Sequence, residues 1–215
     1  MSGPSSVRPR LRGVSHRVAF YVAFVGGIWL VAGSHDRPTR IATAIYATLL
    51  AGMFGVSATL HRGGWSPKVF DWLRRADHAM IFACIAGSYT PFCVLGMPSA
   101  SGMPLLALSW TAAGLGIMRA LLWPHAPRLI SSTLYVATGW VVLAYLPETR
   151  AALDPATFAL LMAGGAWFTV GAFVYLSRRP DPWPALFGFH EVFHVMIILG
   201  CACHFVAIAR LAARA

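Results

Sequence analysis

Two histidines near the carboxyl end of the chain have the spacing of a metal-binding pair. His190 and His194 lie within residues 187–205, an apolar stretch about long enough to cross a bilayer. Residues four apart lie on the same face of a helix, so the two imidazoles can bind one ion. Histidine is costly in hydrocarbon unless it is paired, hydrated or metal-bound. The pair therefore predicts a metal site, and a hydrogen-bonded interfacial histidine is the structural alternative.

Three further polar residues lie at the ends of other apolar stretches. Ser57 and His61 are four apart at the end of the second stretch, and Asp77 precedes the third. If every stretch crosses the membrane, all three lie on the same side as His190 and His194. The three histidines would then give Zn²⁺ three nitrogen ligands and leave a fourth position for water, as in catalytic zinc sites. Zinc lowers the pKa of such water to about 7, so Asp77 could orient it or act as base, and Ser57 could hydrogen-bond a carbonyl oxygen.

The last apolar stretch contains two further ionisable residues. Glu191 completes an HExxH pattern with His190 and His194, in which the glutamate is the base of a metalloprotease. The pattern is short, and Glu191 lies about 100° around the helix from His190, so a protease is the weaker hypothesis. His204 lies roughly 15 Å farther along the helix from His194, which is too far to share the metal. We interpret it as a packing or second-site residue.

These residues belong to a chain with the composition of a membrane protein. Of its 215 residues, 58% are hydrophobic and 11% charged, and the mean hydropathy is +0.65, whereas a soluble domain has about 25% charged residues. Seven continuously apolar stretches are each near the ~20 residues of a spanning helix, and the absence of alternation argues against a β-barrel. We therefore predict an all-α polytopic protein with seven transmembrane helices. The stretches are residues 18–33, 41–60, 78–95, 105–123, 130–146, 157–176 and 186–209.

The distribution of basic residues predicts the orientation of the chain. It has 17 Lys and Arg against 7 Asp and Glu, a balance that would suggest nucleic-acid binding in a soluble protein. With the N-terminus inside, twelve of the 17 basic residues fall in inside segments and five in outside segments. This satisfies the positive-inside rule. We therefore predict an inner (plasma) membrane protein with its N-terminus inside and its C-terminus outside, which contacts anionic lipids and not nucleic acid.

The termini of the apolar stretches suggest local boundaries. Residues 1–15 are rich in Ser, Pro and Arg and are predicted to be a disordered basic tail, which leaves residues 16–215 as a single transmembrane domain. Residues 62–76 are predicted to be a basic loop. Asp77 would then begin a helix, where its commonest structural role is an N-terminal cap. Tyr89-Thr90-Pro91 predicts a kink or exit near the far end of that helix.

Three segments together resemble the haemolysin III proteins. They are SATLH (57–61), RADHAMIFACIAGSYTPF (75–92) and HEVFHVMIILGCACHF (190–205). That family is the bacterial branch of the progestin and adipoQ receptor superfamily, which is grouped with alkaline ceramidases. The resemblance covers nearly the whole chain. It implies a seven-helix fold with zinc on His61, His190 and His194, and with Ser57 and Asp77 near the zinc-bound water. It implies lipid-amide hydrolysis for the superfamily and haemolytic activity for this branch.

Two classes of function remain open at this point. The leading hypothesis is a zinc-dependent hydrolase of lipid amides with its site on the cytoplasmic side, where an apolar bundle with one wet metal end suits an amphipathic substrate. The alternative is a non-enzymatic cytolytic, pore-forming or sensor protein with structural zinc. No ring of charges or continuous polar face runs through the stretches, which disfavours a constitutive pore. Direct binding of zinc by Asp77 would favour the structural role.

Overall fold

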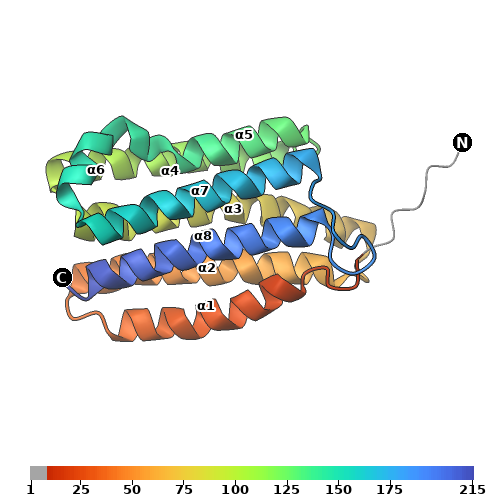
Figure 1. The fold of residues 1–215 in the computed structure, drawn as a ribbon, viewed down its shortest axis with the longest axis horizontal. Coiled ribbons are helices and arrows are strands. Elements are labelled where there is room, and N and C mark those ends of the chain that lie inside the picture. Colours follow the sequence, from red (N-terminus) through yellow and green to blue (C-terminus); the bar gives the residue numbers. More distant parts are fainter. Residues whose placement is uncertain (1–8) are drawn as a thin grey trace, which may run out of the picture.

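The computed structural model describes residues 9–215, and this part of the chain is helical (Figure 1). Within it, seven segments are long and apolar enough to cross a membrane, the fifth being built from three short helices. The predicted all-α, seven-helix class is thereby confirmed, and the orientation of the termini stays a prediction. The elements are α1 (Val14–Ala32), α2 (Arg37–Arg62), α3 (Pro67–Gly96), α4 (Ser99–Leu122), α5 (Arg128–Gly139), a 3-10 helix (Val141–Tyr145), α6 (Leu146–Ala152), α7 (Pro155–Ser177) and α8 (Phe189–Ala212).

The helices lie side by side in one elongated bundle (Figure 1). The first four pack against their neighbours in chain order, while α8 packs along α7 and also contacts α1, α2 and α3. Tyr46, Phe82 and Ile208 are buried between the helices, whereas Tyr21 and Val22 of α1 are exposed. Apolar side chains on the outside of such a bundle suit contact with lipid rather than water. The chain is therefore a multi-pass membrane protein whose α8 lies next to α2.

The third helix begins earlier than the sequence predicts. Ser66 caps it by accepting a hydrogen bond from the Val69 amide at 3.4 Å, and Pro67 follows at its first position. Gly63, with φ 83°, ends the preceding helix in a conformation that other residues rarely adopt. Most of the predicted loop 62–76 is therefore helical. Asp77 lies inside α3, so the prediction that it caps a helix is wrong.

The fifth span is broken where the sequence predicts a continuous helix. α5 ends at Gly139 and a 3-10 helix follows. The Tyr89 hydroxyl donates to the Gly139 carbonyl at 2.6 Å and accepts from the Val142 amide at 3.0 Å. In a membrane, backbone groups freed by a break must find partners inside the protein. Tyr89 supplies both partners, and α3 continues past the predicted kink at Pro91 to Gly96.

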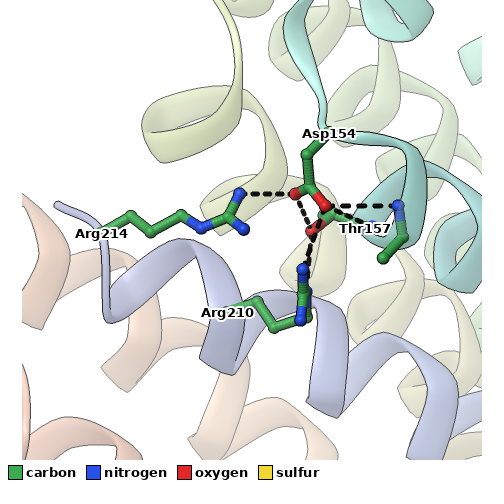
Figure 2. Close-up of polar contacts among 5 residues, drawn as sticks. Asp154, Thr157, Arg210 and Arg214 are labelled. Carbon is green, nitrogen blue, oxygen red and sulfur yellow. Dashed lines mark hydrogen bonds and ion pairs between the residues drawn. The ribbon is translucent and has the colours of Figure 1, made fainter.

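An ion-pair cluster ties the connection before α7 to the end of α8 (Figure 2). Asp154 caps α7 through the Ala156 and Thr157 amides and accepts a 2.5 Å hydrogen bond from the Thr157 hydroxyl. Its two carboxylate oxygens also pair with Arg210 at 3.0 Å and with Arg214 at 2.5 Å. One side chain thus joins two helices at the end of the bundle where the C-terminus lies (Figure 1).

Candidate metal centre

Three imidazoles come together where the end of α2 meets the start of α8. One ring nitrogen from each of His61, His190 and His194 lies within 4.8 Å of the other two. The Nε2 atoms of His61 and His190 are 3.2 Å apart. Bonds of about 2.0–2.1 Å to a tetrahedral zinc place neighbouring ligand nitrogens about 3.4 Å apart. The observed spacing is therefore compatible with a shared ion, as the sequence predicted.

The helix ends explain why these side chains meet. His190 and His194 lie one turn apart in the first two turns of α8, which runs antiparallel to α2 (Figure 1). Gly13, with φ 77°, lies directly against His61, and a Cβ there would be 2.5 Å from the Cβ of His61. Glycine at this position therefore permits the close approach that brings the N-terminal segment onto the site.

The donor set fits a metal ion. His194 is only 2% exposed, and its Nδ1 has no hydrogen-bond partner among residues 9–215. A buried polar atom without a partner is costly and needs an explanation. Three clustered imidazoles match the nitrogen ligand sets of Zn²⁺.

Asp77 and Ser57 line one cavity together with His190 and His194. Asp77 projects from α3 and Ser57 from α2, four residues before His61. In the described part of the chain, the cluster of potential ligand atoms contains the three histidines and not Asp77. The Asp77 carboxylate thus belongs to the cavity wall, the position expected of a group acting beside the metal. The catalytic roles of Asp77 and Ser57 stay predictions.

A fourth histidine belongs to the site and was missed in the sequence. His16 of α1 is 4% exposed, and its Nδ1 lies 2.8 Å from the Ser57 Oγ. Its ring stacks on that of His194, with centroids 3.6 Å apart and planes 8° from parallel. His16 lies two residues before the first apolar stretch (18–33), at the predicted boundary between the basic tail and the transmembrane domain. In the sequence, the one indication that His16 has a role is its position at the edge of an apolar stretch, where an unpaired histidine is costly.

Among residues 9–215, Glu191 does not belong to the cluster of three potential metal-binding histidines. Its Oε1 pairs with the Arg12 Nε at 2.6 Å, and its Oε2 accepts from the Gly188 amide at 2.9 Å. Glu191 is 1% exposed and closes the first turn of α8 in the manner of a capping box. Both carboxylate oxygens are thus engaged at the helix start, which disfavours the HExxH protease hypothesis.

Part of the predicted tail is folded against this end of the bundle. The Arg10 and Leu11 amides each donate at 3.1 Å to the carbonyls of Ala185 and Leu186. Residues 1–8 of the predicted tail lie outside the described residues. Residues 9–13 precede α1 and pair with the segment before α8, so the prediction of disorder does not hold for them. The N-terminal segment instead packs against the histidine cluster, where Gly13 contacts His61.

The cavity beside the histidines is elongated and largely apolar. It has a volume of about 160 Å³ and reaches from His16 and Asp77 past Leu50 to Thr149 and Leu153. Leu153 follows α6, so the cavity approaches the opposite end of the bundle.

His204 lines the same cavity far from the metal centre. Its Nε2 lies 3.2 Å from the Leu161 carbonyl oxygen, and its ring packs edge-on between Phe92 and Phe168. These contacts agree with the packing role predicted for His204.

Comparison with known proteins identifies the family. The family model described as "Haemolysin-III related" matches residues 5–205. The chain is 29% identical to Hemolysin-3 of Bacillus cereus over 197 residues, which cover 91% of this chain and 87% of that protein. It is 29% identical to the Hemolysin-3 homolog of Bacillus subtilis (strain 168) over 153 residues, covering 71% and 69%. It is 28% identical to the heptahelical transmembrane protein ADIPOR2 of Oryza sativa subsp. japonica over 198 residues, covering 82% and 83%. The chain therefore belongs to the haemolysin-III related family, within the progestin and adipoQ receptor superfamily.

Proposed function

We propose that this protein is a zinc-dependent hydrolase of membrane lipid amides. The observation that carries the proposal is that His190 and His194, two of the three clustered histidines, line an apolar cavity whose wall also holds Asp77 and Ser57. This places metal ligands, a carboxylate and a hydroxyl beside a space suited to a hydrocarbon chain. We further propose that the site faces the cytoplasm, because the basic segments lie at this end of the bundle.

Zinc is the proposed ion because its sites are commonly built from imidazole nitrogens, and three protein ligands are typical of catalytic zinc. Zn²⁺ bound to His61, His190 and His194 would supply a Lewis acid and activate water toward a carbonyl carbon. The proton transfer and the stabilisation of the substrate oxygen are assigned to side chains of this protein.

Asp77 is the proposed general base. Its carboxylate accepts the proton of the water that attacks the amide carbonyl carbon. When the C–N bond breaks, the same proton passes to the leaving nitrogen, so that the products are a fatty acid and an amine. Asp77 is the acidic residue among those that line the cavity, which suits it to this transfer.

Ser57 is the proposed hydrogen-bond donor to the amide carbonyl oxygen. Its hydroxyl has one proton, and its oxygen lies 2.8 Å from the His16 Nδ1. If His16 donates from Nδ1, Ser57 keeps its own proton to donate, either to the neighbouring Asp77 carboxylate or to the substrate oxygen on which negative charge develops. In that tautomer His16 would direct the Ser57 proton toward the cavity.

The test is turnover of long-chain N-acyl amides by purified protein in detergent, with His61→Ala as the metal-site variant. We expect release of fatty acid by the wild type and loss of that activity in the variant. Two relatives are named haemolysins, so leakage of lipid vesicles is measured in parallel. Leakage without amide turnover, unaffected by His61→Ala, would replace the hydrolase with a cytolytic function.

A further inference from the structure

A second group of polar side chains, contributed by α3, α4 and α5, has no part in the proposed reaction. All three guanidinium nitrogens of Arg119 are buried and have no hydrogen-bond partner among the described residues. The His78 Nδ1 and the Tyr135 hydroxyl are also buried and make no hydrogen bond of normal geometry within residues 9–215, and the nearest charged group to the Tyr135 hydroxyl is the Arg119 guanidinium. Native proteins contain few buried polar atoms without a hydrogen-bond partner. Three neighbouring side chains with such atoms therefore need an explanation.

These side chains lie close together at the metal-centre end of the bundle. The Arg119 guanidinium carbon is 6.0 Å from the centroid of the Tyr135 ring and 5.8 Å from that of Phe82. His78 lies four residues before Phe82 on α3, one helical turn away. Gly116 lets α4 approach, because a Cβ there would lie against the Phe82 ring. The aromatic faces stabilise the cation but satisfy none of its N–H donors.

The unsatisfied groups are chiefly donors. Guanidinium offers five N–H donors and no acceptor, while the phenol and a neutral imidazole each offer one donor. No acidic side chain forms an ion pair with Arg119 in the described part of the chain. The group that complements such a set is an oxyanion, for which arginine is well suited.

The cavity connects these donors to an apolar space. Tyr135 and His78 line the same cavity as His190 and His194, whereas Arg119 does not. Tyr135 and His78 would therefore contact the oxyanion, and Arg119 would supply the positive charge beside it. Asp77 lines this cavity too, so the Arg119 charge would offset the repulsion between the Asp77 carboxylate and a bound anion.

We propose that His78, Arg119 and Tyr135 form a subsite for the oxyanion headgroup of an amphipathic lipid whose chain lies in the cavity. The headgroups that this subsite would accept are a phosphate or a carboxylate. A lipid rather than a soluble anion is the source, because the cavity continues from this subsite along apolar residues such as Ile81, Ile85 and Leu105. The inference concerns binding alone and holds whether or not the protein is a hydrolase.

The test compares two ether lipids that contain no bond a hydrolase of amides could cleave: octadecylglycerol and octadecylglycerol phosphate. Binding of each to purified protein in detergent is measured for the wild type, Arg119→Met and Tyr135→Phe. The matched control is Arg150→Met, because Arg150 also lies over an aromatic ring, that of Phe158, at 5.1 Å, but is not among the cavity-lining residues. Glycerol phosphate without the chain is the soluble probe.

We expect the wild type to bind the phosphorylated lipid roughly 10-fold or more tightly than the alcohol, as charge-assisted hydrogen bonds allow. Arg119→Met and Tyr135→Phe should remove most of this preference and leave alcohol binding within twofold, and Arg150→Met should bind as the wild type does. Equal wild-type affinity for both lipids, or an equal loss for both in the variants, would overturn the subsite. Glycerol phosphate binding as tightly as the phosphorylated lipid would overturn the lipid assignment. If Arg119→Met does not fold, two other variants decide the question. Tyr135→Phe should lose the preference for the phosphorylated lipid, and Arg119→Lys, which keeps the charge, should keep that preference.

Discussion

At the scale of single residues, Asp77 and Glu191 are two carboxylates with different surroundings. Asp77 lines the cavity beside the histidines, whereas Glu191 is held by Arg12 and the Gly188 amide. A base must reach the proton that it removes, at about 2.6–3.2 Å or through one water. Position therefore favours Asp77 over Glu191 as the proposed base and gives Glu191 a structural role at the start of α8.

The corresponding prediction separates the two carboxylates. Asp77→Asn should retain zinc and lose lipid-amide turnover by about 10²-fold, the magnitude typical of general-base catalysis. Glu191→Gln keeps an oxygen for the Gly188 amide but loses the ion pair with Arg12, so it should unfold at a lower temperature and retain activity. Zinc content, turnover and thermal unfolding are measured on both variants. An inactive Glu191→Gln beside an active Asp77→Asn would instead favour a metalloprotease.

At the scale of elements, Tyr89 of α3 compensates for the break in the fifth span. Its hydroxyl bonds Gly139 on one side of the break and Val142 on the other. We predict that Tyr89→Phe destabilises the protein by about 1–3 kcal/mol, because it leaves two backbone groups without partners. Tyr21→Phe is the control, since Tyr21 is 62% exposed on α1. Equal thermal unfolding temperatures for the two variants in detergent would contradict this role.

Asp154 also stabilises a connection between helices, at the end of the bundle opposite the histidine cluster (Figure 2). The Thr157 hydroxyl, followed by Arg210, the Thr157 amide and Arg214, holds the pKa of Asp154 well below its usual range. A carboxyl group whose pKa is lower in the folded state adds stability above its unfolded pKa of about 3.9. That stability is lost as the pH falls through the folded pKa.

Asp154→Asn should therefore lower the unfolding temperature at pH 7, and its difference from the wild type should shrink at a pH below about 4. Glu148→Gln is the control, because Glu148 is exposed in the neighbouring α6 and forms no ion pair within residues 9–215. Thermal unfolding at both pH values measures the effect. A constant difference between wild type and Asp154→Asn across this range would rule out the charge as its source.

At the scale of the whole molecule, the placement of the two ends depends on the membrane orientation. The metal centre and the N-terminal segment lie at one end of the bundle, and the C-terminus lies at the other (Figure 1). We predict that a reporter fused after Ala215 is outside the cytoplasm and that one inserted in the loop 63–66 is inside. Reporter activity in intact cells measures this directly. The opposite pattern would place the metal centre on the outer side.

The convergence of His61, His190 and His194 could be predicted from the sequence because helix ends in a bundle of seven spans must meet on one side or the other. The roles of His16 and Arg12 could not be predicted, since a basic segment before the first apolar stretch has the composition of a solvated tail. His16 contacts Ser57 and Arg12 contacts Glu191, so both contacts join residues far apart in the chain. The break after Gly139 could not be predicted either, because the apolar run is continuous there. Tyr89, which bonds the Gly139 carbonyl, lies 50 residues earlier in the chain.

The measurement that tests the central claim most directly is the zinc content of the purified protein, together with the ligands bound to the metal as seen by X-ray absorption. The wild type should hold about one zinc per chain on three imidazole nitrogens, with the oxygen of water as the fourth ligand. His190→Ala and His194→Ala should each lose most of the metal. His204→Ala, a histidine of the same helix outside the cluster, should keep it. Stoichiometric zinc that survives both cluster substitutions, or a wild type that binds no metal, would contradict the site and the hydrolase built on it.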